Sequence, residues 1–419
     1  MMKYAQKIRR RNYVLLALFI GIYVCASTCT SSDPSLDSAK NSKGQSFAAP
    51  GSVACRSCHK NIYQRHIATA HYRDSRPALA TYIKGSFDSG RNRFVYNRST
   101  EVVMEHKVNG FFQTAFVNGK EYKSEPFDIV IGSGRKGQTY LYYGGDGKLF
   151  QLPVSFSTSA GSWCNSPGYY PDSIRFNRPV NAYCLECHAT QAGPEDQIIY
   201  GIDCEKCHGP GAEHVNYHTT HPGEQKAKYI INAKLLSRQQ RLDACASCHS
   251  GLRVPLRPAF SFRVGDTLNK FSLPGFVAGR PEVHGNQYGL LLSSKCFQQS
   301  RMDCSTCHDV HTNEAGSPKL FSQRCMTCHN QAAHNTCTLP PANGLVLGDN
   351  CIDCHMPALP SQKIALQPSG VSKEMLSGLS KATPTLVRTH HIGVYPDNTK
   401  EYQKEWLEKL KARKASRPE

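Results

Sequence analysis

The alternation of apolar and polar residues is clearest between about residues 93 and 157. Six short runs there are rich in aromatic and β-branched residues: Arg93–Tyr96, Glu101–Val108, Phe111–Val117, Phe127–Ile131, Thr139–Tyr143 and Leu149–Ser157. Asn109-Gly110, Asn118-Gly119 and Gly144-Gly145 separate some of these runs, and an Asn-Gly pair between alternating runs is the strongest short signal of a hairpin. The pattern predicts an antiparallel unit of four to six strands.

Two further segments have a distinct apolar pattern. Tyr402, Trp406 and Leu410 recur at every fourth position, which predicts a helix over about Lys400 to Ala415. Val14 to Ala26 is the longest apolar run, and it is shorter than the roughly 20 residues that a membrane span requires. The pattern therefore excludes a polytopic membrane protein.

The N-terminal apolar run follows a basic stretch that contains Lys3, Lys7 and Arg9 to Arg11 and no acidic residue. A basic segment followed by an apolar one is typical of an export signal. The small residues before Cys29 resemble a lipoprotein cleavage site, with Cys25 and an uncleaved anchor as alternatives. We expect an export signal over 1–28 and a flexible tether, rich in Ser, Ala, Lys and Pro, over 29–50.

The most informative feature of the composition is its 19 cysteines and 18 histidines. The motif Cys-x-x-Cys-His occurs seven times, a pattern that is typical of covalent c-type haem attachment. Two thiols three positions apart reach the two vinyl groups of one porphyrin, and the adjacent histidine becomes the proximal iron ligand. The motifs are Cys55/Cys58/His59, Cys184/Cys187/His188, Cys204/Cys207/His208, Cys245/Cys248/His249, Cys304/Cys307/His308, Cys325/Cys328/His329 and Cys351/Cys354/His355.

Zinc ribbons and disulfides are the two alternative uses of these cysteines. Cys184/Cys187 with Cys204/Cys207, and Cys304/Cys307 with Cys325/Cys328, have spacings that are compatible with zinc ribbons. Neither a zinc ribbon nor a disulfide needs a histidine after every second cysteine, and an exported chain disfavours reduced thiols. The sequence therefore predicts seven covalently attached c-type haems.

The formal net charge of +18 would by itself suggest a nucleic-acid partner. The leader carries five of these charges, and the propionates of seven haems would offset most of the remainder. We therefore expect a holoprotein near neutrality that binds no nucleic acid, with its Lys and Arg residues pairing with propionates.

The motif spacing predicts the domain organisation. We expect a first haem segment over 51–90, a β-rich insertion over 91–180, a six-haem domain over 181–395 and a C-terminal helix over 396–419. The six-haem domain has too few residues per motif for an ordinary core. The predicted fold is therefore mainly α and irregular, packed around haems, with an antiparallel β insertion between the first and second motifs.

The histidines outside the motifs are candidates for the second axial ligand of an iron. Such a ligand fills the remaining coordination position and favours electron transfer over reaction with a substrate. His214 follows a Gly-Pro-Gly turn, and His311 follows His308 by three residues. Three further candidates, His284, His334 and His390, sit in loops between or after motifs. His71 comes 12 residues after the first attachment histidine. We expect these six to be ligands and His106 to lie on the surface of a strand.

The chain resembles a family at several of these motifs. Cys55–His59 followed by His71, Cys207-His-Gly-Pro-Gly-x-x-His214 and Cys307-His-Asp-x-His311 resemble multihaem cytochromes c. The most similar group includes the tetrahaem cytochromes of ammonia oxidisers and hydroxylamine oxidoreductase. The resemblance implies that His71, His214, His311 and His390 are distal ligands, and that the haems pack in parallel and perpendicular pairs.

These features predict an electron-transfer protein. We expect an exported cytochrome on the periplasmic side of a bacterial membrane or at the cell surface. Its partners would be other cytochromes or a quinol-oxidising membrane complex, and a lipid anchor would hold it to the membrane. The alternative is an oxidoreductase that acts on a small nitrogen or sulfur compound at one five-coordinate haem, although no Cys-x-x-Cys-Lys motif occurs. Cys164, Cys296 and Cys337 lie outside the motifs, and we expect one disulfide and one buried thiol among them.

Overall fold

The computed structural model describes residues 51–169, 174–193, 198–275, 285–330, 337, 347–366 and 383–415. Contacts within the chain divide it into two units, of which one contains 210–231 and the other contains the remaining described residues. The export signal and tether, as well as His284 and His334, lie outside the described residues.

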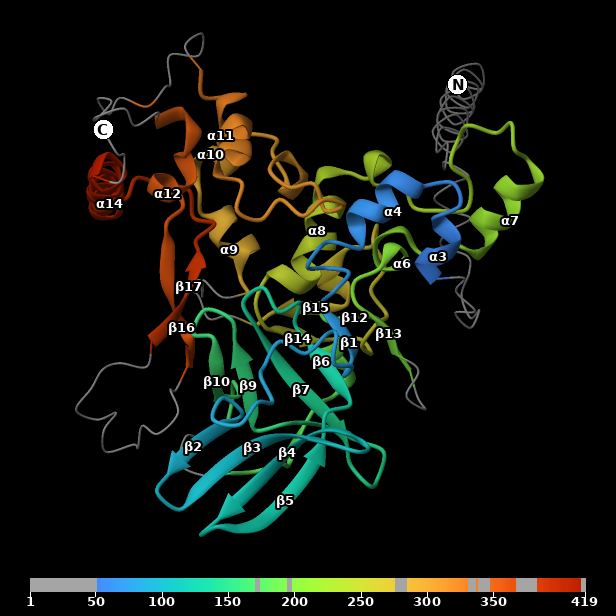
Figure 1. Cartoon of the computed structure of the whole chain (residues 1–419). Coiled ribbons are helices and arrows are strands. Elements are labelled where there is room, and N and C mark those ends of the chain that lie inside the picture. The colour runs from blue at the N-terminus through green and yellow to red at the C-terminus, as the bar shows by residue number, and fades with distance from the viewer. Residues whose placement is uncertain are drawn as a thin grey trace, which may run out of the picture. The chain divides into compact units, whose positions relative to one another are not determined.

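Antiparallel strands dominate the region between the first two motifs (Figure 1). A four-stranded sheet has the order β2-β3-β4-β5, and a seven-stranded sheet runs β1-β6-β7-β8-β11, with β9 on β7 and β10 on β9. The strands are β1 (Ser75–Pro77), β2 (Arg93–Asn97), β3 (Thr100–Lys107), β4 (Gly110–Val117), β5 (Lys120–Pro126), β6 (Ile129–Ile131), β7 (Gly137–Tyr143), β8 (Leu149–Gln151), β9 (Val154–Ser157), β10 (Ser162–Asn165) and β11 (Arg178–Pro179).

The hairpin turns of the four-stranded sheet lie where the Asn-Gly pairs predict them. Asn118 and Gly119 connect β4 to β5 with φ values of 51° and 73°, so both occupy the left-handed region that a two-residue hairpin turn requires. Gly110 opens β4 at φ 126° and pairs with Lys107 of β3. These turns fix the register of the central hairpins.

The two sheets share one apolar core. Phe94 of β2 and Val102 of β3 are fully buried in the same cluster as Tyr140 of β7 and Trp163 of β10. Gln113 of β4 is also buried, and its amide donates to the carbonyl of Val154 at 2.6 Å and accepts from its N–H at 3.0 Å. The amide group therefore satisfies two backbone groups that would be costly to bury unpaired.

The remaining elements are short helices, 3-10 turns and two-stranded ribbons. The helices are α3 (Gly51–Cys55), α4 (Lys60–His66), α5 (Ala182–Leu185), α6 (Cys204–His208), α7 (Ala212–Thr220), α8 (Arg238–His249), α9 (Gln287–Leu292), α10 (Lys295–Gln298), α11 (Pro318–Met326), α12 (Cys351–His355) and α14 (Pro396–Ala415). The ribbons pair β12 (Ala189–Ala192) with β13 (Ile198–Tyr200), β14 (Arg253–Pro255) with β15 (Ser272–Pro274), and β16 (Ala358–Leu366) with β17 (Thr383–Arg388). The 3-10 helices are η1 (Ala233–Leu235), η2 (Leu268–Lys270), η3 (Cys304–Thr306) and η5 (Leu347–Asp349).

The fold is therefore mixed helix and sheet, and it does not support the expected mainly α class. The expectation counted only the strands of the insertion, which the aromatic and β-branched runs between residues 93 and 157 predict. The ribbon β14–β15, between the fourth and fifth motifs, and the ribbon β16–β17, after the seventh, have no comparable signal. No helix among the described residues has both the length and the hydrophobicity of a membrane span.

Candidate haem-attachment sites

The haem-attachment motifs fold as short helical turns. Three of them begin directly after a polar residue whose side chain caps the turn: Asp203, Asp303 and Asn350 accept hydrogen bonds from backbone N–H groups in the first turn of α6, η3 and α12. Asn181 caps α5 in the same way before Cys184. Aspartate and asparagine are favoured at this position because they satisfy N–H groups that the helix leaves unpaired.

In three motifs, the helical turn also brings the histidine back over the first cysteine. The N–H groups of His59, His308 and His329 donate to the carbonyls of Cys55, Cys304 and Cys325 at 2.8, 3.0 and 2.9 Å. Two thiols and one imidazole are thereby presented on successive parts of a single turn. This is the local geometry that covalent haem attachment with proximal ligation requires.

Thiols from different motifs lie in contact. The thiol contacts pair Cys55 with Cys204, Cys187 with Cys248, Cys245 with Cys304, and Cys325 with Cys351. These pairs do not follow the spacing of a zinc ribbon, which would join the thiols of the second and third motifs and those of the fifth and sixth. Within the described ranges, no group of three or more His, Cys, Asp or Glu residues could hold a metal ion.

Four attachment cysteines depart from the expectation of an interior packed around haems, because they are exposed: Cys58, Cys184, Cys207 and Cys328. At Cys58 and Cys328, the immediate neighbours in the chain are exposed as well. The hydroxyls of the preceding residues, Ser57 and Thr327, donate to the two sulfurs at 3.8 and 3.9 Å. The protein's own side chains therefore do not bury these two thiols, since each is the second cysteine of a short turn at the surface. Their attachment to haem stays a prediction from the motif.

Three attachment histidines face a second imidazole. The ring centroids of His249 and His71 are 6.0 Å apart, those of His208 and His311 are 6.1 Å apart, and those of His308 and His390 are 6.2 Å apart. The last two pairs are nearly parallel, with interplanar angles of 19° and 28°, whereas His71 and His249 are inclined at 67°.

These separations match two imidazoles that share a metal ion. A ring nitrogen lies about 2 Å from a bound metal, so coordination from both sides places the ring centroids about 6 Å apart. The residues present therefore fit an iron with two histidine ligands at these three places. His71, His311 and His390, which the sequence predicts as distal ligands, are the second members of the three pairs.

Burial favours the neutral, ligating form of these rings. Burial, and next the neighbouring His249, lowers the pKa of His71 to about 4. Burial and His308 likewise lower the pKa of His390 to about 4, and the Nδ1 atom of His390 is buried without a hydrogen-bond partner. Burial, then His208, also lowers the pKa of His311. A neutral imidazole offers the lone pair that iron requires.

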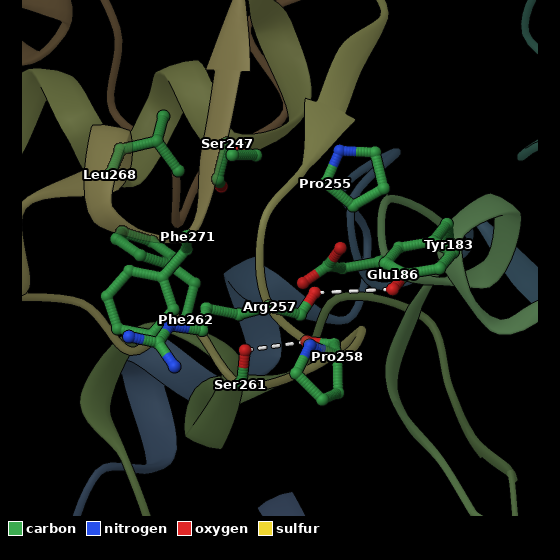
Figure 2. Close-up of a pocket in the computed structure, with 11 residues that line it drawn as sticks. Tyr183, Glu186, Ser247, Pro255, Arg257, Pro258, Ser261, Phe262, Leu268 and Phe271 are labelled. Carbon is green, nitrogen blue, oxygen red and sulfur yellow. Dashed lines mark hydrogen bonds between the residues drawn. The ribbon is translucent and has the colours of Figure 1, made fainter.

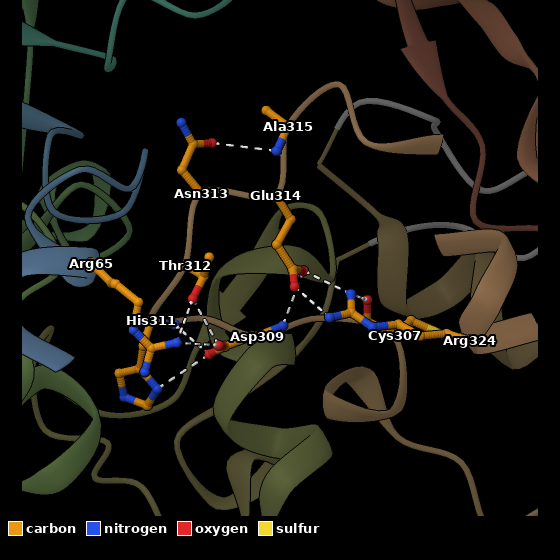
Figure 3. A network of polar contacts seen from close by, with 9 residues as sticks. All are labelled: Arg65, Cys307, Asp309, His311, Thr312, Asn313, Glu314, Ala315 and Arg324. Carbon is orange, nitrogen blue, oxygen red and sulfur yellow. Dashed lines mark hydrogen bonds and ion pairs between the residues drawn. The ribbon is translucent and has the colours of Figure 1, made fainter. Parts of the chain in front are cut away.

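A polar network holds His311 (Figure 3). The Asp309 carboxylate accepts the backbone N–H of His311 at 2.9 Å and lies 3.4 Å from its Nδ1. Arg65 of α4 donates to Thr312 at 3.1 Å and to Asp309 at 3.4 Å, and it thereby joins the first motif segment to the fifth. The other nitrogen of His311 is left for a metal.

The ring nitrogens of two other attachment histidines have different acceptors. Nδ1 of His188 lies 2.8 Å from Oδ2 of Asp74, and Nδ1 of His355 lies 2.9 Å from the carbonyl oxygen of Gly393. Such bonds orient an axial imidazole and fix which nitrogen can bind the metal. Despite the desolvation of the ring, the hydrogen bond and charge of Asp74 leave the pKa of His188 raised.

The smaller unit contains His214 on α7. Nδ1 of His214 lies 2.8 Å from the carbonyl oxygen of Lys228, and its ring is 4.6 Å from that of His218. The carbonyl contact requires Nδ1 to carry the proton, so the tautomer of His214 is fixed and Nε2 holds a lone pair. The side chain is thus in the form that binds a metal.

Part of the exposed apolar surface lies beside the motifs. Six of the exposed large hydrophobic residues lie within three positions of a motif: Val53, Ile62, Tyr183, Leu252, Val310 and Met326. Leu252 is 87% exposed and Val53 is 66% exposed. A porphyrin attached at the neighbouring cysteines would cover such residues, so this surface also fits the cofactor.

A small cavity lies between the second and fourth motifs (Figure 2). Tyr183 and Glu186 of the second motif line it together with Ser247 of the fourth, and the Tyr183 hydroxyl donates to the carbonyl of Arg257 at 3.3 Å. Its volume is about 30 Å³, which is room for one or two water molecules. Its lining includes none of the predicted iron ligands.

Cys164, Cys296 and Cys337 carry free thiols, so the expected disulfide is not formed. Cys164 is the buried thiol, with 3% exposure, and it donates to the carbonyl of Ser155 at 3.5 Å. Burial raises the pKa of Cys164 to about 12, which makes it an unreactive core residue. Cys337 is exposed and Cys296 is half-buried.

Sequence reasoning missed several residues at these sites. His66 is buried at the end of α4, with Nε2 3.1 Å from the carbonyl of Ile202 and its ring 6.1 Å from that of His311. Asp74 and Asp309 contact ligand histidines through the folded chain. Asp309 had a signal, since it lies between two candidate ligands, but nothing in the sequence relates Asp74 to a histidine 114 positions away.

Comparison with known proteins supports the interpretation. The family model described as "Cytochrome c554 and c-prime" matches residues 173–209, which contain the second and third motifs. A crystal structure of outer cell wall cytochrome OcwA is similar in fold, with a TM-score of 0.51 and 17% sequence identity over 87% of this chain and 88% of that chain. No curated protein matches. The family-model match therefore supports c-type haem attachment at the second and third motifs, and the structural match shows a similar fold.

Proposed function

We propose that the protein is an exported seven-haem c-type cytochrome that carries electrons through closely packed haems, most of them held between two histidines. The observation that carries the proposal is the set of three imidazole pairs at 6.0 to 6.2 Å, each of which includes one attachment histidine. An iron with a histidine ligand on each side has no free coordination position, so it exchanges electrons without binding a substrate.

Contacts between motif thiols support close packing of neighbouring haems. Cys55 with Cys204 joins the first motif to the third, Cys187 with Cys248 joins the second to the fourth, and Cys245 with Cys304 joins the fourth to the fifth. Cys325 with Cys351 joins the last two motifs. Haems attached at thiols in contact would lie edge to edge, which is the arrangement that electron transfer needs.

The cellular setting is part of the proposal. The basic, then apolar, N-terminus supports export to the periplasmic side of a bacterial membrane or to the cell surface, with a lipid anchor at Cys29 or Cys25. Its partners would be other cytochromes or a quinol-oxidising membrane complex. If Cys29 carries the lipid, Cys29→Ser should move the protein from the membrane fraction to the soluble fraction. Unchanged membrane association would favour Cys25 or an uncleaved anchor.

The spin states of the haems test the function. His71→Ala, His311→Ala and His390→Ala should each convert one low-spin signal in electron paramagnetic resonance to high-spin, with covalent haem unchanged because attachment depends on the cysteines. His106→Ala is the matched control, since His106 is exposed on β3 and stacks on Phe111 at 4.7 Å. Unchanged spectra in all three variants would contradict the ligand assignment.

The number of haems and the alternative activity are tested on the unmodified protein. Seven haems would raise the mass of the purified protein above that of the processed polypeptide by seven haem units. A fully low-spin protein that exchanges electrons with a small dye and does not turn over nitrite or hydroxylamine supports electron transfer. Turnover of either compound at a high-spin haem would establish the oxidoreductase instead.

A further inference from the structure

In the second motif, the histidine that would bind iron has a carboxylate beside one of its ring nitrogens. Nδ1 of His188 lies 2.8 Å from Oδ2 of Asp74, and the carboxylate accepts the ring proton. The His188 side chain is 41% exposed and Nε2 is available to a metal, whereas the carboxylate is 24% exposed. The hydrogen bond therefore involves the ring nitrogen opposite the one that would bind iron.

The backbone on both sides of this bond is anchored independently of it. Ser75 donates from its hydroxyl to the carbonyl oxygen of His188 at 2.7 Å, and it accepts the N–H of Gly201 at 2.9 Å. The carbonyl of Asp74 itself accepts the N–H of Gly132 at 2.5 Å. Because the backbone at both ends is held, the carboxylate meets the imidazole at a smaller conformational entropy cost than in an exposed ion pair.

His355 provides an internal comparison. Its Nδ1 faces the carbonyl of Gly393 at 2.9 Å, a neutral acceptor at nearly the same distance. A carboxylate withdraws the ring proton more strongly than a carbonyl does, so it makes the other ring nitrogen a stronger donor to a metal. A stronger donor stabilises ferric over ferrous iron, and hydrogen bonding to the axial ligand is one of the means by which a protein sets a haem potential.

The position of Asp74 links this site to a second one. Its N–H donates to the carbonyl of His71 at 3.2 Å, so one turn of chain carries both side chains. His71 faces His249 of the fourth motif at 6.0 Å, and the thiols of Cys187 and Cys248 are in contact. The second and fourth motifs are therefore neighbours, and the turn from His71 to Asp74 contributes one residue to each.

We propose that Asp74 is a positioning residue that lowers the reduction potential of the haem at Cys184–His188 relative to the haem at Cys351–His355. The inference rests on the proposed function only in that a haem is attached at Cys184 and Cys187.

Potentiometric titration of the haem-loaded, full-length protein, followed by its absorption spectrum, tests the proposal. In Asp74→Asn, one component of the titration should shift to higher potential, while the other components and the haem content stay as in the wild type. Asp74→Glu, which retains a carboxylate, should keep the component at low potential. Asp88→Asn is the charge-matched control, because Asp88 is an exposed partner of Arg91, and it should shift no component.

The outcomes separate this proposal from the proposed function. A titration of Asp74→Asn that superimposes on that of the wild type, with all haems attached, would overturn the role of Asp74 and leave electron transfer intact. If Asp74→Asn loses the haem, Asp74→Glu decides. A shift to higher potential in Asp74→Glu despite its carboxylate contradicts the proposal, and retention of both haem and low potential supports it. A wild-type protein without haem at Cys184 and Cys187 would contradict the proposed function itself.

Discussion

Two regions of the chain bury apolar surface differently: the strand-rich region between Ser75 and Pro179, and the motif-bearing region after it. In the first region, fully buried residues such as Phe94, Tyr140 and Trp163 form one contiguous cluster. In the described part of the second region, buried apolar residues such as Leu236, Leu268 and Leu290 belong to neither apolar cluster, and Leu252 beside the fourth motif is exposed. The first region therefore folds around its own side chains, whereas the described part of the second has no apolar cluster of comparable size.

We expect the largest difference between the two regions when haem attachment is prevented. In a host without haem-attachment machinery, hydrogen exchange should protect amides of β3, β4 and β7, while those of α8, α11 and α12 exchange rapidly. Where no apolar core exists, the free energy of haem binding supplies the stability of the folded state, so that region is unstable without haem. The haem-loaded protein is the control, and equal protection of both regions in the haem-free protein would contradict the comparison.

Within the strand-rich region, truncation of the core should be costly without loss of haem. Phe94→Ala is expected to lower the free energy of unfolding of this region by about 3 to 5 kcal/mol, because Phe94 is fully buried. Urea unfolding followed by tryptophan fluorescence measures the change, with haem content determined in parallel. Val108→Ala, at a fully exposed position, is the matched control and should change little. Loss of haem from Phe94→Ala would show that the two regions depend on each other.

In the motif-bearing region, polar pairs should contribute more than apolar contacts. The Glu314 carboxylate, with 8% of its side chain exposed, pairs with Arg324, and this hydrogen bond chiefly holds its pKa below the usual 4.5. Because the folded-state pKa is depressed, the stabilisation is fully present above about pH 4.5 and is lost as the pH falls through the folded-state value.

Glu314→Gln should therefore destabilise the protein by about 2 kcal/mol at pH 7. The difference from wild type should disappear as the pH falls below the depressed pKa of Glu314. Thermal unfolding of both proteins as a function of pH measures this, and a difference that is independent of pH would rule out the charge as the cause.

The smallest effect is expected at the surface of the C-terminal helix. Lys409 and Glu405 pair at 3.3 Å on α14, but their side chains are 71% and 57% exposed. Glu405→Gln should change the thermal midpoint barely at all, because exposed pairs of this kind contribute at most a few tenths of a kcal/mol. A clear loss of stability would show that α14 packs against haem-binding segments through this face.

Local signals predicted much of the strand-rich region and of the attachment motifs. The Asn-Gly pairs located the central hairpins because a two-residue turn with positive φ imposes its own geometry. Strand β10 and the ribbon β14–β15 had no such signal, because their pairing depends on distant partners. The mainly α expectation failed for the same reason.

The sequence by itself predicted which residues attach haem, because the spacing of two thiols and a histidine within one turn is a local property of the chain. It also indicated His71, His311 and His390 as partners for iron. Only the tertiary structure decided that these three face His249, His208 and His308, that thiols of different motifs touch, and that Asp74 accepts the proton of His188 from 114 positions away. Such pairings depend on how separated segments pack, and no local pattern of residues encodes the distance between them.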